Sequence, residues 1–198
     1  NSLRRNAVYA RKATDKYLEE HLAASSYTAY KRLVLAGKAP AELNNADRAV
    51  LYALRSSDPA RLEDINGISE GLQNRIVSAA VSARSIQELF ENVKTKRYPM
   101  TAVRRAVLCA WLGIKKISAP PAYARVLALN ETGAQILKTA KRRADIPITE
   151  SLAKAARTGA AAKQSAEAEI RSGEAYAMLT PAIGSGREEL TRKIRICE

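Results

Sequence analysis

Residues 85–99 read SIQELFENVKTKRYP, and they predict a helix that ends in a strongly basic corner. Ser85 and Glu88 have the spacing of a capping box, in which two side chains satisfy free N–H groups at a helix start. The apolar residues inside this helix recur at helical spacing: Ile86, Leu89, Phe90 and Val93. Pro99 predicts the start of the next helix. The corner between the two helices is either a solvated loop or the docking place of an anionic partner with flat faces.

Most of the first 115 residues reads as short helices separated by capping residues, glycine and proline. Asn45 is expected to cap a helix that contains Val50 and Leu54. Asp58 followed by Pro59 predicts another helix start. Cys109 lies among apolar residues and is expected to be a small core residue.

Past Pro121 the pattern changes to that of a small α/β unit. Residues 124–129 (ARVLAL) predict a short buried strand, and residues 146–149 (IPIT) predict an edge strand, because Pro147 cannot donate to a ladder. A helix capped by Asn130 is expected between them, over residues 131–143. Its inward residues are expected to be Ile136, Leu137 and Ala140.

An alanine-rich helical stretch with a loop near Gly159 follows, then a helix over about 167–179, and a weakly patterned tail from Pro181. The expected fold class is α+β and predominantly helical, with a helical region followed by a small strand–helix–strand unit.

Net charge is the most informative feature of the composition. The 198 residues carry 33 lysines and arginines against 20 aspartates and glutamates, a formal charge of +13. Such a surplus favours a polyanionic partner, either nucleic acid or an acidic membrane surface. No apolar run approaches the ~20 residues of a membrane-spanning helix, no signal peptide is recognisable, and residue 1 is not Met. We therefore expect a soluble cytoplasmic protein, without a membrane partner, whose natural start lies upstream.

Residues that carry catalysis are scarce. The single histidine, His21, lies in a charged stretch and is expected at the surface. Neither a carboxylate pair nor a His/Cys cluster with ligand spacing occurs, and Gly184-Ser185-Gly186 is too short for a phosphate loop. We expect no catalytic residue and no metal site in this chain, and whether it is an enzyme stays open.

Cations without acids mark the candidate binding surface. Between Asn92 and Asn130 there are eight lysines and arginines and no aspartate or glutamate. A helix start with free N–H groups suits a phosphate, and Tyr98 is an aromatic ring on which an unpaired base can stack. We favour RNA contact over a solvated corner. The expected RNA-binding residues are Arg75, Lys94, Lys96, Arg97, Tyr98, Arg104 and Arg105.

A second basic cluster lies at the end of the predicted 131–143 helix: Lys138, Lys141, Arg142 and Arg143. Cations at a helix C-terminus are favoured by the helix dipole in any protein. RNA contact and simple dipole stabilisation are therefore about equally supported for this cluster.

Several motifs resemble those of the tRNA(Met) cytidine acetate ligase family. Residues 70–76 (EGLQNRI) and 94–98 (KTKRY), followed by the Arg104-Arg105 helix, are similar to the family's EGLENR and KTKRY motifs. Residues 122–130 (AYARVLALN) and 175–179 (AYAML) resemble later segments. Residues 26–31 (SYTAYK) resemble a degenerate form of the nucleotide-site motif SATAIR.

The resemblance implies ATP-dependent activation of acetate as acetyl-adenylate and transfer of the acetyl group to the wobble cytidine of elongator tRNA(Met). It also implies that ATP binds mainly through an HxGH-bearing nucleotidyltransferase-like domain. That domain is expected to be missing here, so the chain alone is expected to need no cofactor. By the same resemblance, Arg4, Arg5, Ser26 and Thr28 are candidate nucleotide-binding residues. Gln73 stands where the family has Glu, which is expected to remove an acid near the RNA face.

The expected domains are a remnant of the nucleotidyltransferase domain at 1–40, a helical basic domain at 41–118 and a small α/β domain at 119–198. The leading hypothesis is the C-terminal tRNA-binding portion of such a ligase, inactive without its N-terminal domain. Two alternatives are a stand-alone RNA-binding adaptor without catalysis and a structural or oligomerising module whose charge serves solubility. The sequence leaves the oligomeric state open.

Overall fold

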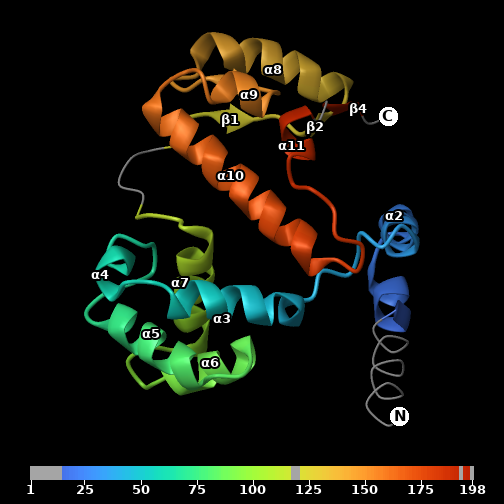
Figure 1. The fold of residues 1–198 in the computed structure, drawn as a ribbon. Helices are drawn as coiled ribbons and strands as arrows, with labels where there is room; N and C mark the ends of the chain where they lie inside the picture. Colours follow the sequence, from blue (N-terminus) through green and yellow to red (C-terminus); the bar gives the residue numbers. More distant parts are fainter. Residues whose placement is uncertain (1–14, 117–120, 192–193, 197–198) are drawn as a thin grey trace.

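The computed structural model describes residues 15–116, 121–191 and 194–196 of the chain. A helical part and a smaller mixed part are joined by one long helix, α10 (Ala160–Leu179), which runs diagonally between them (Figure 1). The predicted fold class is confirmed: the protein is a predominantly helical α+β protein, and the strands of its described residues all lie in the second half.

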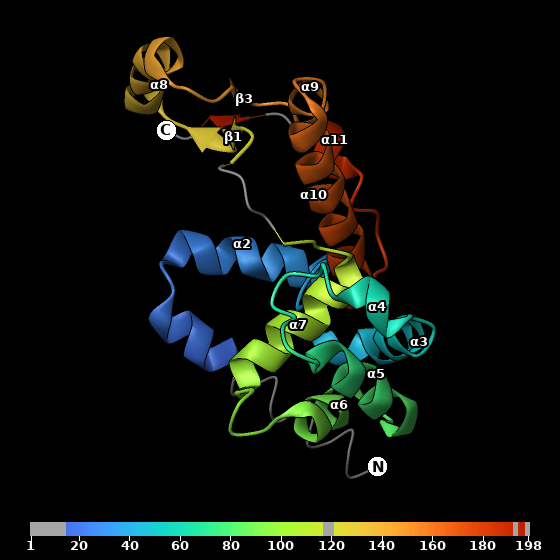
Figure 2. The ribbon, with the colours of Figure 1, turned by 90° about the vertical axis from the view of Figure 1, so that its left-hand side faces the viewer.

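The helical part contains a helix over residues 15–21 and seven further elements. In chain order these are α2 (Ala24–Leu35), the 3₁₀ helix η1 (Leu43–Ala46), α3 (Asp47–Arg55), α4 (Pro59–Leu62), α5 (Leu72–Ser82), α6 (Ile86–Val93) and α7 (Met100–Leu112). Helix α2 extends away from the others, and no residue in it is buried (Figures 1 and 2).

The capping chemistry largely follows the sequence. The Ser85 hydroxyl accepts from the Glu88 N–H at 3.1 Å, and the Glu88 carboxylate accepts from the Arg84 N–H at 2.8 Å, so the predicted capping box is confirmed one residue wider than expected. Asp58 caps α4 by accepting from the Ala60 N–H at 3.0 Å. Asn45 was wrongly assigned as a cap. It lies within η1, and its side chain donates to the Leu179 carbonyl at 2.8 Å.

Helices α3, α5, α6 and α7 enclose the main hydrophobic core. Phe90 is its largest side chain and is 2% exposed. Cys109 is buried on α7, as expected, and burial raises the pKa of its thiol. Other fully enclosed members of this core are Val50, Leu54, Leu72, Ile76, Leu89, Val93, Val103 and Val107.

The mixed part holds two separate two-stranded parallel sheets, β1 (Ala124–Arg125) with β3 (Ile148–Thr149) and β2 (Ala128–Leu129) with β4 (Arg195–Ile196). The single buried strand predicted over 124–129 is therefore wrong. The chain leaves the first sheet after Arg125 and enters the second at Ala128, while Leu127 is 57% exposed. The second predicted strand is confirmed, and it begins directly after Pro147.

Helix α8 (Glu131–Arg143) has the predicted bounds, and Asn130 caps it by accepting from the Gly133 N–H at 2.9 Å. Its inward face was partly misassigned, because Ile136 is 64% exposed while Leu137 and Ala140 are half-buried. The predicted loop near Gly159 separates α9 (Leu152–Ala155) from α10, which is one continuous helix. The tail is more regular than expected, since it forms α11 (Glu188–Thr191) and β4.

A charged cluster ties β1 to α10. The Glu169 carboxylate accepts from the Tyr123 hydroxyl at 2.5 Å and from the Arg125 guanidinium at 2.9 Å. The Arg125 side chain is only 9% exposed, so this pair is shielded from screening. Burial, followed by the bond to Glu169, raises the pKa of the Tyr123 phenol and keeps it protonated as a donor.

The other end of α10 and the following tail contact the helical part. The Glu42 N–H donates to the Leu179 carbonyl at 3.0 Å, and the Ala182 N–H donates to the Gly37 carbonyl at 2.9 Å. The predicted domain boundaries at 40 and 118 stay predictions.

The glycine-containing tail segment over residues 184–186, too short for a phosphate loop, packs on α10. Gly186 lies directly against the backbone of Gly173 and Glu174 on α10, where a Cβ would collide. The Gly186 N–H and the Ser185 hydroxyl both donate to the Glu174 carboxylate, at 3.1 Å each. Glycine is required there because two backbones approach each other closely.

We expect Gly186→Ala to destabilise the protein by about 1–3 kcal/mol, because the added methyl has no room between two backbones. Gly184→Ala is the matched control, since a Cβ at Gly184 meets nothing within 4 Å. Urea unfolding midpoints of both variants measure the difference. Equal midpoints would show that the tail does not pack on α10 in this way.

Candidate nucleic-acid interface

The basic corner lies where the chain turns from α6 into α7. We use this name for Lys94, Lys96, Arg97, Tyr98, Arg104 and Arg105 together. Helix α6 ends at Val93, and Pro99 is the N-cap of α7. The turn between them closes on itself, because the Thr95 N–H donates to the Tyr98 carbonyl and the Tyr98 N–H donates to the Thr95 hydroxyl, both at 3.1 Å.

Glu70, immediately before α5, anchors this turn. Its carbonyl accepts from the Tyr98 hydroxyl at 3.0 Å, and its carboxylate forms an ion pair with Arg97. The Arg97 guanidinium also lies 5.6 Å from the centre of the Tyr98 ring. Glu70 adopts a left-handed backbone with φ of 47°, a conformation that costs a residue with a side chain some energy. The corner is therefore bonded to the start of α5.

Arg75 is committed to the protein itself. From α5 it donates to the carbonyl of Val93 at 2.7 Å and to that of Asn92 at 2.8 Å. These are carbonyls at the C-terminus of α6 that lack partners within the helix, so Arg75 acts as a cap for α6. Arg75 is exposed and supports the corner through these two bonds, and its contact with RNA stays a prediction.

The remaining cations face solvent. The Lys94 ammonium is 4.0 Å from the Glu91 carboxylate, and this exposed ion pair contributes little to the stability of the fold. The Arg104 guanidinium lies 5.6 Å from the centre of the buried Phe90 ring, and its own side chain stays exposed. Within the described part of the chain, Lys96 and Arg105 form no ion pair. The corner thus combines cations fixed by the fold with cations that are free to bind phosphate.

Tyr98 is less available than the sequence predicted. It is half-buried and packs against the main core, and its hydroxyl is bonded to Glu70. Gln73 also differs from expectation. It is buried, 9% exposed, and its amide N–H donates to the Glu63 carboxylate at 3.3 Å. An acid at this position would oppose the Glu63 carboxylate, and the effect of Gln73 on the charge near the RNA face stays a prediction.

The structure describes two of the four candidate nucleotide-binding residues. Arg4 and Arg5 lie outside the described residues. Ser26 and Thr28 are exposed on α2, and the Thr28 hydroxyl donates to the Ala24 carbonyl at 2.8 Å. Both hydroxyls lie on a helix that buries none of its residues, and their place at a nucleotide site stays a prediction.

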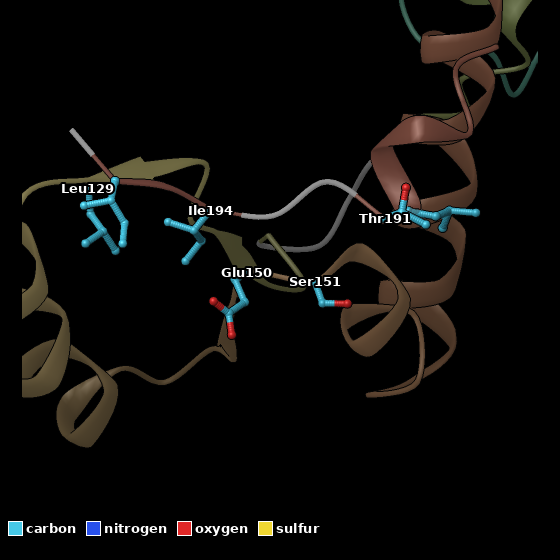
Figure 3. Close-up of a pocket in the computed structure, with 7 residues that line it drawn as sticks. Leu129, Glu150, Ser151, Thr191 and Ile194 are labelled. Atoms are coloured by element: carbon cyan, nitrogen blue, oxygen red, sulfur yellow. The ribbon is translucent and has the colours of Figure 1, made fainter.

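The mixed part has an open pocket of about 570 Å³. Figure 3 shows Leu129, Glu150, Ser151, Thr191 and Ile194 around it, and Leu190 and Ile196 also line it. The Ser151 hydroxyl already caps α9 by accepting from the Lys154 N–H, and the Thr191 hydroxyl donates to the Glu188 carbonyl. Among the described residues of this mainly apolar lining, Glu150 is the one charged group.

The described residues include no group of three or more His, Cys, Asp or Glu side chains placed to hold a metal. His21 is exposed, as predicted, and stacks on Tyr17 with ring centres 4.0 Å apart. No helix in the described ranges is long and apolar enough to span a membrane.

The fold is shared with a solved nucleotide-bound protein. The crystal structure of Thermotoga maritima TmcAL bound with alpha-thio ATP aligns with a TM-score of 0.83 at 23% identity, over 97% of this chain and 50% of the other. The apo form of the same protein aligns with a TM-score of 0.79. These alignments show that the chain has the same fold as the aligned half of TmcAL.

A family model described as HIGH Nucleotidyl Transferase matches residues 1–189, and the chain belongs to this family. Relatives named tRNA(Met) cytidine acetate ligase include one from Listeria monocytogenes serotype 4a, 34% identical over 66% of this chain and 39% of its own length. Another, from Acetivibrio thermocellus, is 30% identical over 81% of this chain and 41% of its own length. The chain spans about two fifths of these relatives.

The predicted family resemblance is confirmed. The prediction that the HxGH-bearing domain is missing is not supported, because the family model matches from residue 1.

Arg75, which supports the corner, and Arg105, which belongs to it, can be distinguished by their effect on stability. We expect Arg75→Ala to lower the free energy of unfolding by about 1.5 kcal/mol, because two carbonyls at the end of α6 lose a charged donor. Arg105→Ala is expected to change it by less than about 0.5 kcal/mol, since Arg105 is exposed. Chemical denaturation of both variants measures this contrast, and equal stability would exclude a capping role for Arg75.

Proposed function

We propose that this chain positions tRNA for a ligase that acetylates the wobble cytidine of elongator tRNA(Met), with the basic corner as its phosphate-binding surface. One observation carries the proposal: in a chain related to tRNA(Met) cytidine acetate ligases, Lys96, Arg104 and Arg105 face solvent at a corner that is braced from behind. A polyanion bound at this corner would supply negatively charged partners for these three cations.

The proposed division of work is physical. Contacts to phosphates fix the position and orientation of an RNA without choosing its bases. Arg75 and Glu70 hold the turn in one conformation, so little order has to be imposed when RNA binds. The half-buried ring of Tyr98 lies beside these cations as a surface against which an unpaired base can stack.

In the proposed reaction, ATP supplies the activation of acetate as an acetyl-adenylate. We assign the described residues the positioning of tRNA, which the exposed cations of the corner support. Ser26 and Thr28 are proposed to lie at the edge of the nucleotide site. This role places the protein in the cytoplasm, with elongator tRNA(Met) as its partner.

The test is tRNA binding by gel shift over a series of salt concentrations. We expect Lys96→Glu/Arg105→Glu to weaken binding at least about tenfold and to reduce the slope of log K against log salt by about 2, because two phosphate contacts are lost. Arg97 is left unchanged, since reversing its charge would oppose Glu70 and disturb the fold.

Arg48→Glu/Arg84→Glu is the matched control. It changes the net charge equally with two exposed arginines, one at the start of α3 and one before α6, at the end of that helix opposite the corner. The control is expected to bind tRNA nearly as tightly as the unaltered protein. If the corner variant and the control bound equally well, the corner would not be the RNA surface.

A further inference from the structure

Helix α8 presents a second group of cations that the basic corner does not explain. Its members are Lys138, Lys141, Arg142 and Arg143, named here the α8 stripe, and all four are exposed. In the described ranges none of them forms an ion pair. The acids of the same segment are Glu131, at the far end of the helix, and Asp145, just beyond it. The stripe therefore carries a local excess of positive charge.

The helix dipole accounts for only part of this stripe. Its influence is confined to the last turn of a helix, and α8 ends at Arg143 with Ala144 as its C-cap. Lys138 lies further back than that turn. It is also three residues from Lys141 and four from Arg142, spacings at which like charges on a helix surface repel each other. This repulsion opposes the favourable effect of the dipole, and an anion that lies against the stripe would relieve it.

The α8 stripe and the basic corner lie in different parts of the protein, and helix α10 connects these parts. Helix α8 packs on β2 in the mixed part, while the corner belongs to the helical part at the other side of α10 (Figures 1 and 2). A helix of the 20 residues of α10 is about 30 Å long. Both of its ends are fixed, because α10 contacts α9 at one end and η1 at the other. The two basic surfaces are therefore carried on one connected frame.

We propose that the α8 stripe is a second phosphate-binding surface, and that one folded RNA contacts the stripe and the basic corner together. This inference rests on the proposed tRNA-positioning function. Two linked contacts bind one molecule far more tightly than either contact alone, provided that the ligand can reach both. We expect a full-length tRNA to reach both surfaces at once, whereas an RNA hairpin much shorter than α10 can reach only one of them. The frame would then select RNAs by their length and shape.

RNA fits the stripe better than an acidic membrane surface does. A helix that lies on a membrane inserts a continuous apolar face beside its cations. In α8 the apolar side chains Leu137 and Ala140 are half-buried against the protein, and Ile136 is left as the large exposed one. The stripe therefore offers charge to phosphates and little apolar surface to lipid.

The test compares Lys138→Glu/Arg142→Glu with the corner variant Lys96→Glu/Arg105→Glu and the control Arg48→Glu/Arg84→Glu. With full-length tRNA, we expect the α8 variant to bind at least about tenfold more weakly than the control and to lose about 2 from its salt slope. With an RNA hairpin much shorter than α10, the same variant is expected to lose at most about twofold, because the corner alone can still hold the hairpin.

Circular dichroism checks that the α8 variant is folded, and Lys138→Gln/Arg142→Gln replaces it if it is not. If the α8 variant binds tRNA like the control while the corner variant fails to bind, the stripe is only a helix terminus and the proposed function stands. If both variants bind like the control, the proposed function fails as well. Binding to phosphatidylserine vesicles that is lost in the α8 variant, with unchanged tRNA binding, would assign the stripe to membranes and overturn the inference.

Discussion

Burial of the facing sides of α6 and α7 in one core determines where the charged corner lies. Val93, the last residue of α6, and Val103, in the first turn of α7, are both fully buried. The residues between them must turn back outside the core, because the two helices are drawn together on either side. Their charged side chains remain in solvent, where hydration is retained. Hydrophobic packing of α6 and α7, rather than any interaction among the cations, therefore keeps the corner exposed to solvent.

The fold provides hydrogen-bond and ion-pair partners for some of the cations near the corner and leaves the others exposed to solvent. Glu70 and the end of α6 engage Arg97 and Arg75, while Lys96 and Arg105 are left to the solvent. The left-handed conformation of Glu70 is the cost of this arrangement, and it is offset by the Tyr98 hydrogen bond and the Arg97 ion pair. A braced turn with free cations in front of it suits a surface that binds a polyanion without rearranging.

Local chemistry was the part of the fold that could be predicted from sequence. The capping box at Ser85, the cap at Asp58 and the bounds of α8 depend on residues within a few positions of each other, and all three are present. The strand prediction over 124–129 was wrong because its pairing depends on distant segments. The Val126 N–H donates to the Thr149 carbonyl, whereas the Leu127 carbonyl accepts from the Arg195 N–H. Because the two partners belong to different strands, residues 124–129 are divided between two sheets.

The sequence by itself determined the helical character of the first half, the presence of the charged corner and the family, since these follow from periodicity, composition and short motifs. Only the tertiary structure decided which cations are free. A list of charges does not reveal that Glu70 lies against Arg97, that Arg75 caps α6 or that Gln73 is buried beside Glu63. Each of these contacts joins residues at least ten positions apart, so they exist only once the hydrophobic core has brought α4, α5, α6 and α7 together.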